Sequence, residues 1–111
     1  MEDEYTVVYE AWVAARKAYR LVERGLGKNP SDDERRELEI QLLELGREKE
    51  RLKNKLAALE AEFDAAQPPT EEQIEAVKGL MAKVEAHTNA TITASAALGL
   101  AASALDFTSK V

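Results

Sequence analysis

The 111-residue chain contains no cysteine and only one histidine, His87. The absence of cysteine excludes disulfide frameworks, thiolate metal sites and cysteine nucleophiles. A single histidine excludes a multi-histidine metal site within one chain, and no residue at helical spacing offers His87 a catalytic partner. The five glycines form no phosphate-binding loop and there is no nucleophile elbow. We therefore expect a protein that is not an enzyme and that binds no cofactor or metal.

Basic residues are also fewer than acidic ones. Lysine and arginine number 15 against 21 aspartate and glutamate residues, which gives a net charge of −6. Nucleic-acid binding depends on clustered positive charge, so we expect no nucleic-acid partner. Residues 1–5 have neither the basic nor the apolar region of a secretory signal. Together with the lack of cysteine, this favours a cytoplasmic location.

Proline is confined to two short breaks in the sequence, one at residues 25–30 and one at 67–70. Because proline disrupts helix interiors, the segments between the breaks predict three helices, over about 4–26, 32–66 and 71–105. Short loops make neighbouring helices antiparallel. The predicted fold is a single all-α domain over 1–111, an up-down-up three-helix bundle with a long coiled-coil-like hairpin of the second and third helices.

The second segment carries the clearest periodicity. Ser31 and Glu34 form a capping box that predicts its start. Apolar residues then follow at alternating steps of four and three, interrupted only by Lys49, which is typical of a coiled-coil seam. The seam is Leu38, Leu42, Leu45, Lys49, Leu52, Leu56, Leu59 and Phe63. Ile40 and Leu43 widen the stripe, so we expect this end of the helix to touch two partners.

The first segment carries most of the bulky aromatic residues, namely Tyr5, Tyr9, Trp12 and Tyr19. The last part of the third segment, which should lie opposite, is rich in alanine, serine, threonine and glycine. Large side chains facing small ones satisfy close packing, so we expect Trp12 to be buried against that part. Gly25 is expected to end the first helix in a left-handed conformation.

The third segment begins with a capping box of Thr70 and Gln73. Residues 87–93 have poor helix propensity, because β-branched side chains lose rotamer freedom in a helix. We expect one continuous helix, with a break at 87–93 as the alternative. Residues 86–105 carry no formal charge apart from any on His87. That length matches a membrane span, but few of these residues are large and apolar, so a membrane partner is not expected.

Residues 47–55 form a basic stripe of Arg47, Lys49, Arg51, Lys53 and Lys55. One interpretation is a docking site for an acidic partner. The favoured one is a charged helix flank that pairs with Glu71, Glu72 or Glu75 on a neighbouring helix, or with another subunit.

The first helix is shorter than the other two, so one end of the hairpin should remain uncovered. The apolar residues expected at that end are Leu56, Leu59, Phe63, Ile74, Val77, Leu80 and Met81. Exposed apolar patches mark interfaces, and this patch predicts self-association, with a homodimer as the commonest form. We expect a non-enzymatic protein–protein interaction module, such as an adaptor, assembly factor or small chaperone, acting as an oligomer. The alternative is a membrane-active or secreted helical protein that uses segment 86–105.

Overall fold

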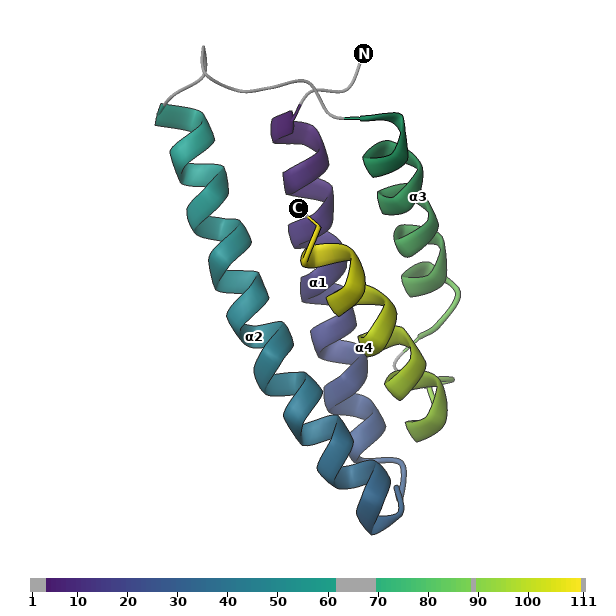
Figure 1. Ribbon diagram of the computed structural model, residues 1–111. Coiled ribbons are helices and arrows are strands. Elements are labelled where there is room, and N and C mark those ends of the chain that lie inside the picture. The colour runs from purple at the N-terminus through teal and green to yellow at the C-terminus, as the bar shows by residue number, and fades with distance from the viewer. Residues whose placement is uncertain (1–3, 62–69, 89, 111) are drawn as a thin grey trace.

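A computed structural model describes residues 4–61, 70–88 and 90–110, and within these ranges all regular secondary structure is α-helical. The helices are α1 (Glu4–Leu26), α2 (Asp32–Ala61), α3 (Glu71–Glu85) and α4 (Ala94–Thr108). Consecutive helices run in opposite directions (Figure 1). The all-α class is confirmed. The predicted end of the second helix, at residue 66, lies outside the described residues.

Capping boxes start two of the helices. At α2, the Ser31 amide donates to Glu34 Oε1 at 2.9 Å and the Glu34 amide donates to Ser31 Oγ at 3.2 Å. At α3, Thr70 and Gln73 make the same reciprocal pair at 3.0 and 3.1 Å. Each box satisfies two backbone donors that the first turn of a helix otherwise leaves unpaired. Both starts agree with the sequence pattern.

The third predicted helix is two helices, so the expectation of a continuous helix over 71–105 is wrong. α3 ends at Glu85 and α4 begins at Ala94, with Thr93 as its N-cap. Between them the amides of Thr88 and Thr91 each donate to the other threonine's hydroxyl, at 3.0 and 3.2 Å. Threonine hydroxyls offer the backbone partners that compete with helical hydrogen bonds. The chain reverses here, and α4 folds back antiparallel to α3 (Figure 1).

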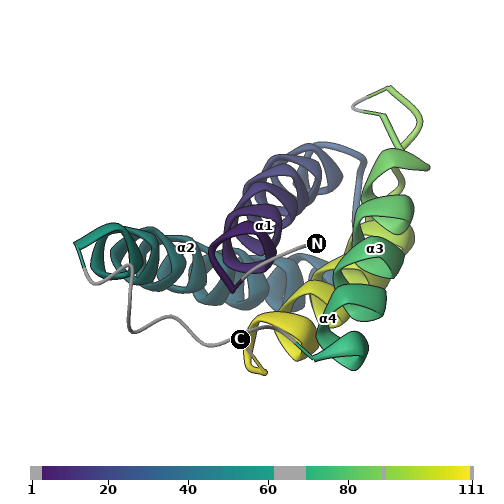
Figure 2. The same ribbon diagram turned by 90° about the horizontal axis from the view of Figure 1, so that it is seen from above.

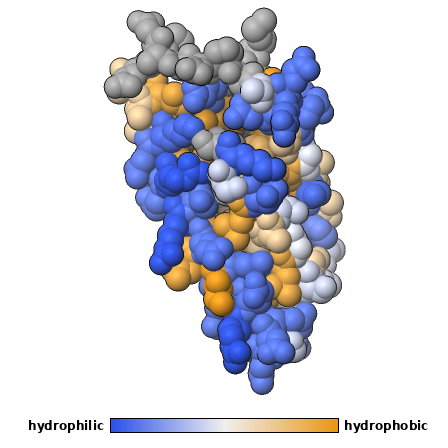
Figure 3. Space-filling model, viewed as in Figure 1, coloured by the Kyte–Doolittle hydropathy of each residue, from blue (hydrophilic) through white to orange (hydrophobic). Residues whose placement is uncertain are grey.

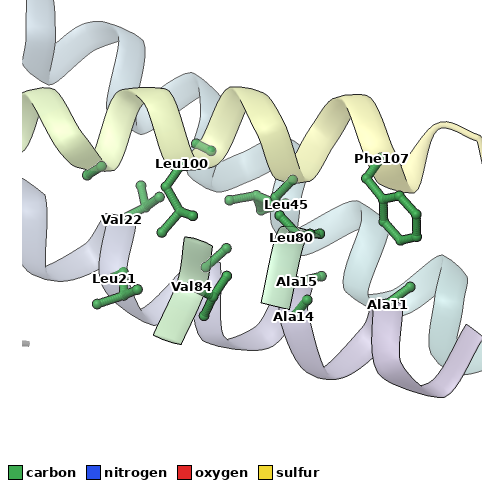
Figure 4. Packing of buried hydrophobic residues seen from close by; sticks show 14 of the residues in the cluster. Ala11, Ala14, Ala15, Leu21, Val22, Leu45, Leu80, Val84, Leu100 and Phe107 are labelled. Carbon is green, nitrogen blue, oxygen red and sulfur yellow. The ribbon is translucent and has the colours of Figure 1, made fainter. Parts of the chain in front are cut away.

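Helix α1 lies at the centre of the bundle and packs against all three other helices. Its buried face consists largely of alanines, and side chains from all four helices converge on that face (Figure 4). The buried alanines are Ala11, Ala14, Ala15 and Ala18. Small residues allow three helices to approach α1 closely at interior packing density.

The predicted hairpin pairing is absent from the described residues. No Cα atom of α2 comes within 8 Å of a Cα atom of α3. α2 instead packs its leucine seam against α1 and α4, and α3 lies on the far side of them (Figure 2). The break at 86–93 explains the difference, because α4 rather than α3 fills the place beside α2.

The aromatic residues of α1 lie at its periphery rather than in the centre, contrary to expectation. Trp12 is half-buried, with the Arg16 guanidinium 4.6 Å from its ring centroid. Tyr9 is 46% exposed and Tyr5 donates its hydroxyl to Glu60 Oε1 at 2.8 Å. The bulk of these rings has no room in the alanine-lined centre.

Gly25 has a packing role that differs from the predicted one. It lies inside α1, and a Cβ atom there would come within 2.7 Å of the Ala97 Cβ atom. The left-handed residue is Asn29, with φ of 52°. Asparagine tolerates that region better than most residues. Gly25 therefore permits the close approach of α1 and α4, and Asn29 supplies the turn.

Candidate interaction surface

The largest exposed apolar side chains of α2 lie on its outer face. Ile40 is 48% exposed and Leu43 is 59% exposed. Each stands two positions from a fully buried leucine, Leu38 or Leu45, and two residues correspond to about 200° around a helix. They therefore point away from the core. α2 lies at one edge of the bundle (Figure 2), so this face meets no other helix among the described residues.

A shallow groove of about 580 Å³ follows the same face. Tyr19 of α1 forms one wall, and its ring lies 4.1 Å from the Lys49 ammonium group, a cation–π contact. Gly46 also lines the groove, and a Cβ atom there would lie 3.6 Å from Tyr19 Cε2. The lining residues are Tyr19, Leu42, Leu43, Gly46, Arg47, Glu50, Arg51 and Asn54. The groove is thus an apolar floor with a charged rim.

The basic stripe of α2 is only partly paired within the chain. Arg51 binds Glu48 at 2.7 Å through Nε, and its Nη2 donates to the carbonyl oxygen of Thr108. Lys55 lies 3.8 Å from a Glu4 carboxylate oxygen. The predicted partners on the neighbouring helix belong to the start of α3, which α2 does not contact. Arg47 and Lys53 are exposed and have no ion partner in the described part of the chain.

The residues predicted to form an uncovered interface are not gathered on one exposed surface. Leu56, Val77 and Leu80 are buried in the core of the chain itself. Leu59, Ile74 and Met81 are half-buried and are divided between α2 and α3, whose Cα atoms stay more than 8 Å apart. Phe63 lies outside the described residues. Three of these seven side chains therefore offer a partner little or no surface, because they belong to the core cluster of the chain.

A second hollow, of about 560 Å³, lies between α3 and the C-terminal half of α4. Leu80 and Phe107 form its apolar floor. At its rim Lys83 Nζ lies 3.5 Å from Ser103 Oγ and Lys110 Nζ lies 3.4 Å from Asp106 Oδ2. The Lys110–Asp106 ion pair lies at the end of α4, and Lys83 reaches across from α3 to the uncharged Ser103 hydroxyl.

His87 lines a smaller hollow of about 350 Å³ with Lys17, Arg20 and Glu85. Its side chain is half-buried. Over 4–61, 70–88 and 90–110, no three histidine, aspartate or glutamate side chains gather in a way that could hold a metal ion.

The uncharged segment 86–105 is divided between a connection and a helix. Residues 86–93 link α3 to α4, and α4 places Ala97, Leu100, Ala101 and Ala104 in the core. In the described part of the chain, no helix combines the length and the apolar character that crossing a membrane requires. The apolar side chains of this segment thus serve the packing of the bundle.

The face seen in Figure 3 is largely hydrophilic, most of all at the lower tip where α1 connects to α2. Apolar side chains show above that tip, over α2 and α4. No protein-family model, curated protein or solved structure matches the chain. The proposal for function therefore rests on the surface itself.

Proposed function

We propose that the chain is a non-enzymatic protein–protein interaction module that acts as an oligomer and docks through the outer face of α2. One observation carries this proposal: Ile40 and Leu43 lie one helical turn apart, 48% and 59% exposed, on a face that no other described element covers. Burying such side chains against a partner is favourable at about 25 cal/mol per Å² of apolar area.

The charged surroundings of the pair support a protein partner. The groove beside Leu43 is rimmed by Arg47, Glu50 and Asn54. An apolar centre with a polar rim is the usual anatomy of a protein–protein interface. The groove between α3 and α4 is a weaker candidate, because Leu80 and Phe107 on its floor are buried and Lys110 and Asp106 at its rim already pair with each other.

The test measures the mass of the protein in solution by sedimentation velocity. We expect the wild type to exceed the monomer mass at tens of micromolar. A double variant, Ile40→Ser with Leu43→Ser, should be monomeric with unchanged helical circular dichroism, because neither side chain belongs to the core. A matched control, Leu59→Ser, removes a leucine of the same helix outside this face. A monomeric wild type, or association that the double variant leaves unchanged, contradicts the proposal.

A further inference from the structure

The charges of α2 are divided between its two halves. Residues 32–39 contain five acidic and two basic side chains, whereas residues 47–55 contain five basic and two acidic ones. The two blocks lie on either side of Leu43, at nearly equal distances along the helix. We infer that two copies of this chain pair through the outer faces of α2, antiparallel, with the two-fold axis at Leu43. This inference rests on the proposed function and adds its partner and geometry.

In an antiparallel pair centred on Leu43, each residue faces the one equally far on the other side of it. Glu39 then faces Arg47 of the second copy, Arg36 faces Glu50, and Asp33 faces Lys53. All six side chains are exposed on α2, and two-fold symmetry repeats each pair. A parallel pair would instead bring each charge against its own copy. The charge pattern thus favours the antiparallel orientation, since complementary charges fix orientation and register.

These six side chains are available for such pairs. None forms an ion pair with another residue of its own chain in the ranges that the structure describes. Three other basic residues of α2 are engaged within the chain, namely Lys49, Arg51 and Lys55. The six unengaged side chains of the proposed pairs all lie within about 80° of Leu43 around the helix, on the side that carries Ile40 and Leu43.

Gly46 supplies an independent observation. Glycine in a helix interior is less favourable than alanine, so its presence needs a reason. Packing against α1 does not require it, because a Cβ atom at this position would lie 3.6 Å from Tyr19 Cε2, an ordinary contact. In the proposed register Gly46 faces Ile40 of the second copy. The missing side chain gives the isoleucine a place beside the ring of Tyr19.

An acidic partner protein is the competing occupant of this face. Such a partner would use Arg47 and Lys53 but would be repelled by the acidic block at 32–39. A second copy satisfies both blocks at once. The self-pairing also predicts association that weakens as salt is added, since exposed ion pairs are screened.

The test uses two single charge reversals, Arg47→Glu and Glu39→Arg, each measured alone and as an equal mixture by sedimentation velocity. Alone, each variant places like charges opposite one another, and we expect at least a tenfold weaker self-association. Mixed, they restore both pairs, and a heterodimer should form at wild-type strength. Residues 39 and 47 are about 12 Å apart along one helix, so recovery in the mixture reports contact between chains.

Matched controls separate this geometry from a change in net charge. Lys78→Glu and Glu75→Arg make the same charge changes at exposed positions of α3, and we expect wild-type association for both. Gly46→Ala should weaken association several-fold, whereas Gly79→Ala, whose added Cβ would meet nothing within 4 Å, should not.

The outcomes distinguish the two proposals. Association that requires Ile40 and Leu43 but ignores the charge reversals, or a mixture that stays monomeric, overturns the antiparallel pairing and leaves the interaction module standing. A wild type that is monomeric at about 50 µM, where a micromolar complex would form, overturns both. Binding to an acidic protein without self-association also contradicts the inference.

Discussion

The inner and outer faces of α2 follow similar spacing but have different partners. On the inner face Leu38, Leu45 and Leu52 are completely buried against the rest of the bundle. On the outer face Arg36, Ile40, Leu43, Arg47, Glu50 and Asn54 also alternate steps of four and three. Only two of these six are apolar, and Leu43 is 59% exposed. The leucines satisfy the core, whereas the mixed outer face remains available to another chain.

The two faces share the same spacing, so the composition of each face determines whether it is buried in the core or remains exposed to a partner. A continuous apolar seam is removed from water when the chain folds, because burial of each large side chain contributes about 1.5–3 kcal/mol. A seam of two apolar residues flanked by charges is stable in water and still specifies a partner through its charges. One helix can therefore serve folding with one face and recognition with the other.

The largest expected effect comes from truncating the same residue type on each face. Leu45→Ala should destabilise the protein by about 3 kcal/mol, since it opens a cavity in the core. Leu43→Ala should change the free energy of unfolding of the monomer by less than about 0.5 kcal/mol. Urea denaturation at a protein concentration below the onset of association measures both. Equal losses of unfolding free energy in the two variants would contradict the distinction between a buried inner face and an exposed outer face.

A contact between α1 and α4 provides the next test of buried against exposed positions. Gly25→Ala should destabilise by about 1–3 kcal/mol, because its Cβ would lie 2.7 Å from the Ala97 Cβ atom. Gly99→Ala meets nothing within 4 Å and should stabilise by about 0.5–1 kcal/mol through helix propensity. Thermal denaturation compares them, and a stabilised Gly25 variant would disprove the close approach.

Arg51 stands between the two faces and fastens α2 to the end of α4. Its guanidinium donates to the Thr108 carbonyl, a group at the C-terminus of α4 that also carries the negative end of the helix dipole. Arg51→Ala should cost about 1 kcal/mol. Lys53→Ala, an exposed neighbour, is the control and should have little effect on monomer stability. Equal free energies of unfolding for the two variants, measured by urea denaturation, would show that the Arg51 hydrogen bond does not stabilise the protein.

The smallest expected effect concerns Tyr5, at the edge where α1 meets the end of α2. Its hydrogen bond to the Glu60 carboxylate, with help from burial, raises the pKa of the Tyr5 phenol above its ordinary value of 10.0. The hydrogen bond therefore contributes fully below pH 10 and is lost as the pH rises through the higher folded pKa. Spectroscopic titration should show a late phenolate component that Tyr5→Phe abolishes and Glu60→Gln moves to lower pH. A titration that Glu60→Gln leaves unchanged would contradict the contact.

Much of the helix pattern could be predicted from the sequence, because its signals are local. Ser31 with Glu34 and Thr70 with Gln73 mark helix starts through bonds that span three residues. In the sequence, the break between α3 and α4 is indicated only by weak helix propensity. The structure adds a tertiary contact, because Ile92 in this connection is 1% exposed and packs in the core of the folded chain. A tertiary contact of that kind outweighs propensity and is absent from any local pattern.

The candidate site was predicted in part. Ile40 and Leu43 were noticed as extra apolar residues, but as a widening of the inner stripe. Their offset of two positions from Leu38 and Leu45 already places them on the opposite side of a helix. The position of the predicted interface followed from three continuous helices, whereas Leu56, Val77 and Leu80 are buried within the four-helix chain.

The most direct test of the antiparallel pairing uses the lack of cysteine in this chain. A single Leu43→Cys substitution places one thiol beside the proposed two-fold axis, where Cα atoms about 4.4–6.8 Å apart permit a disulfide. Under mild oxidation we expect this variant to form a covalent dimer rapidly, while Asn54→Cys on the same face and Gly79→Cys on α3 do not. Cross-linking at position 54 as fast as at position 43, or none at position 43, would contradict the pairing.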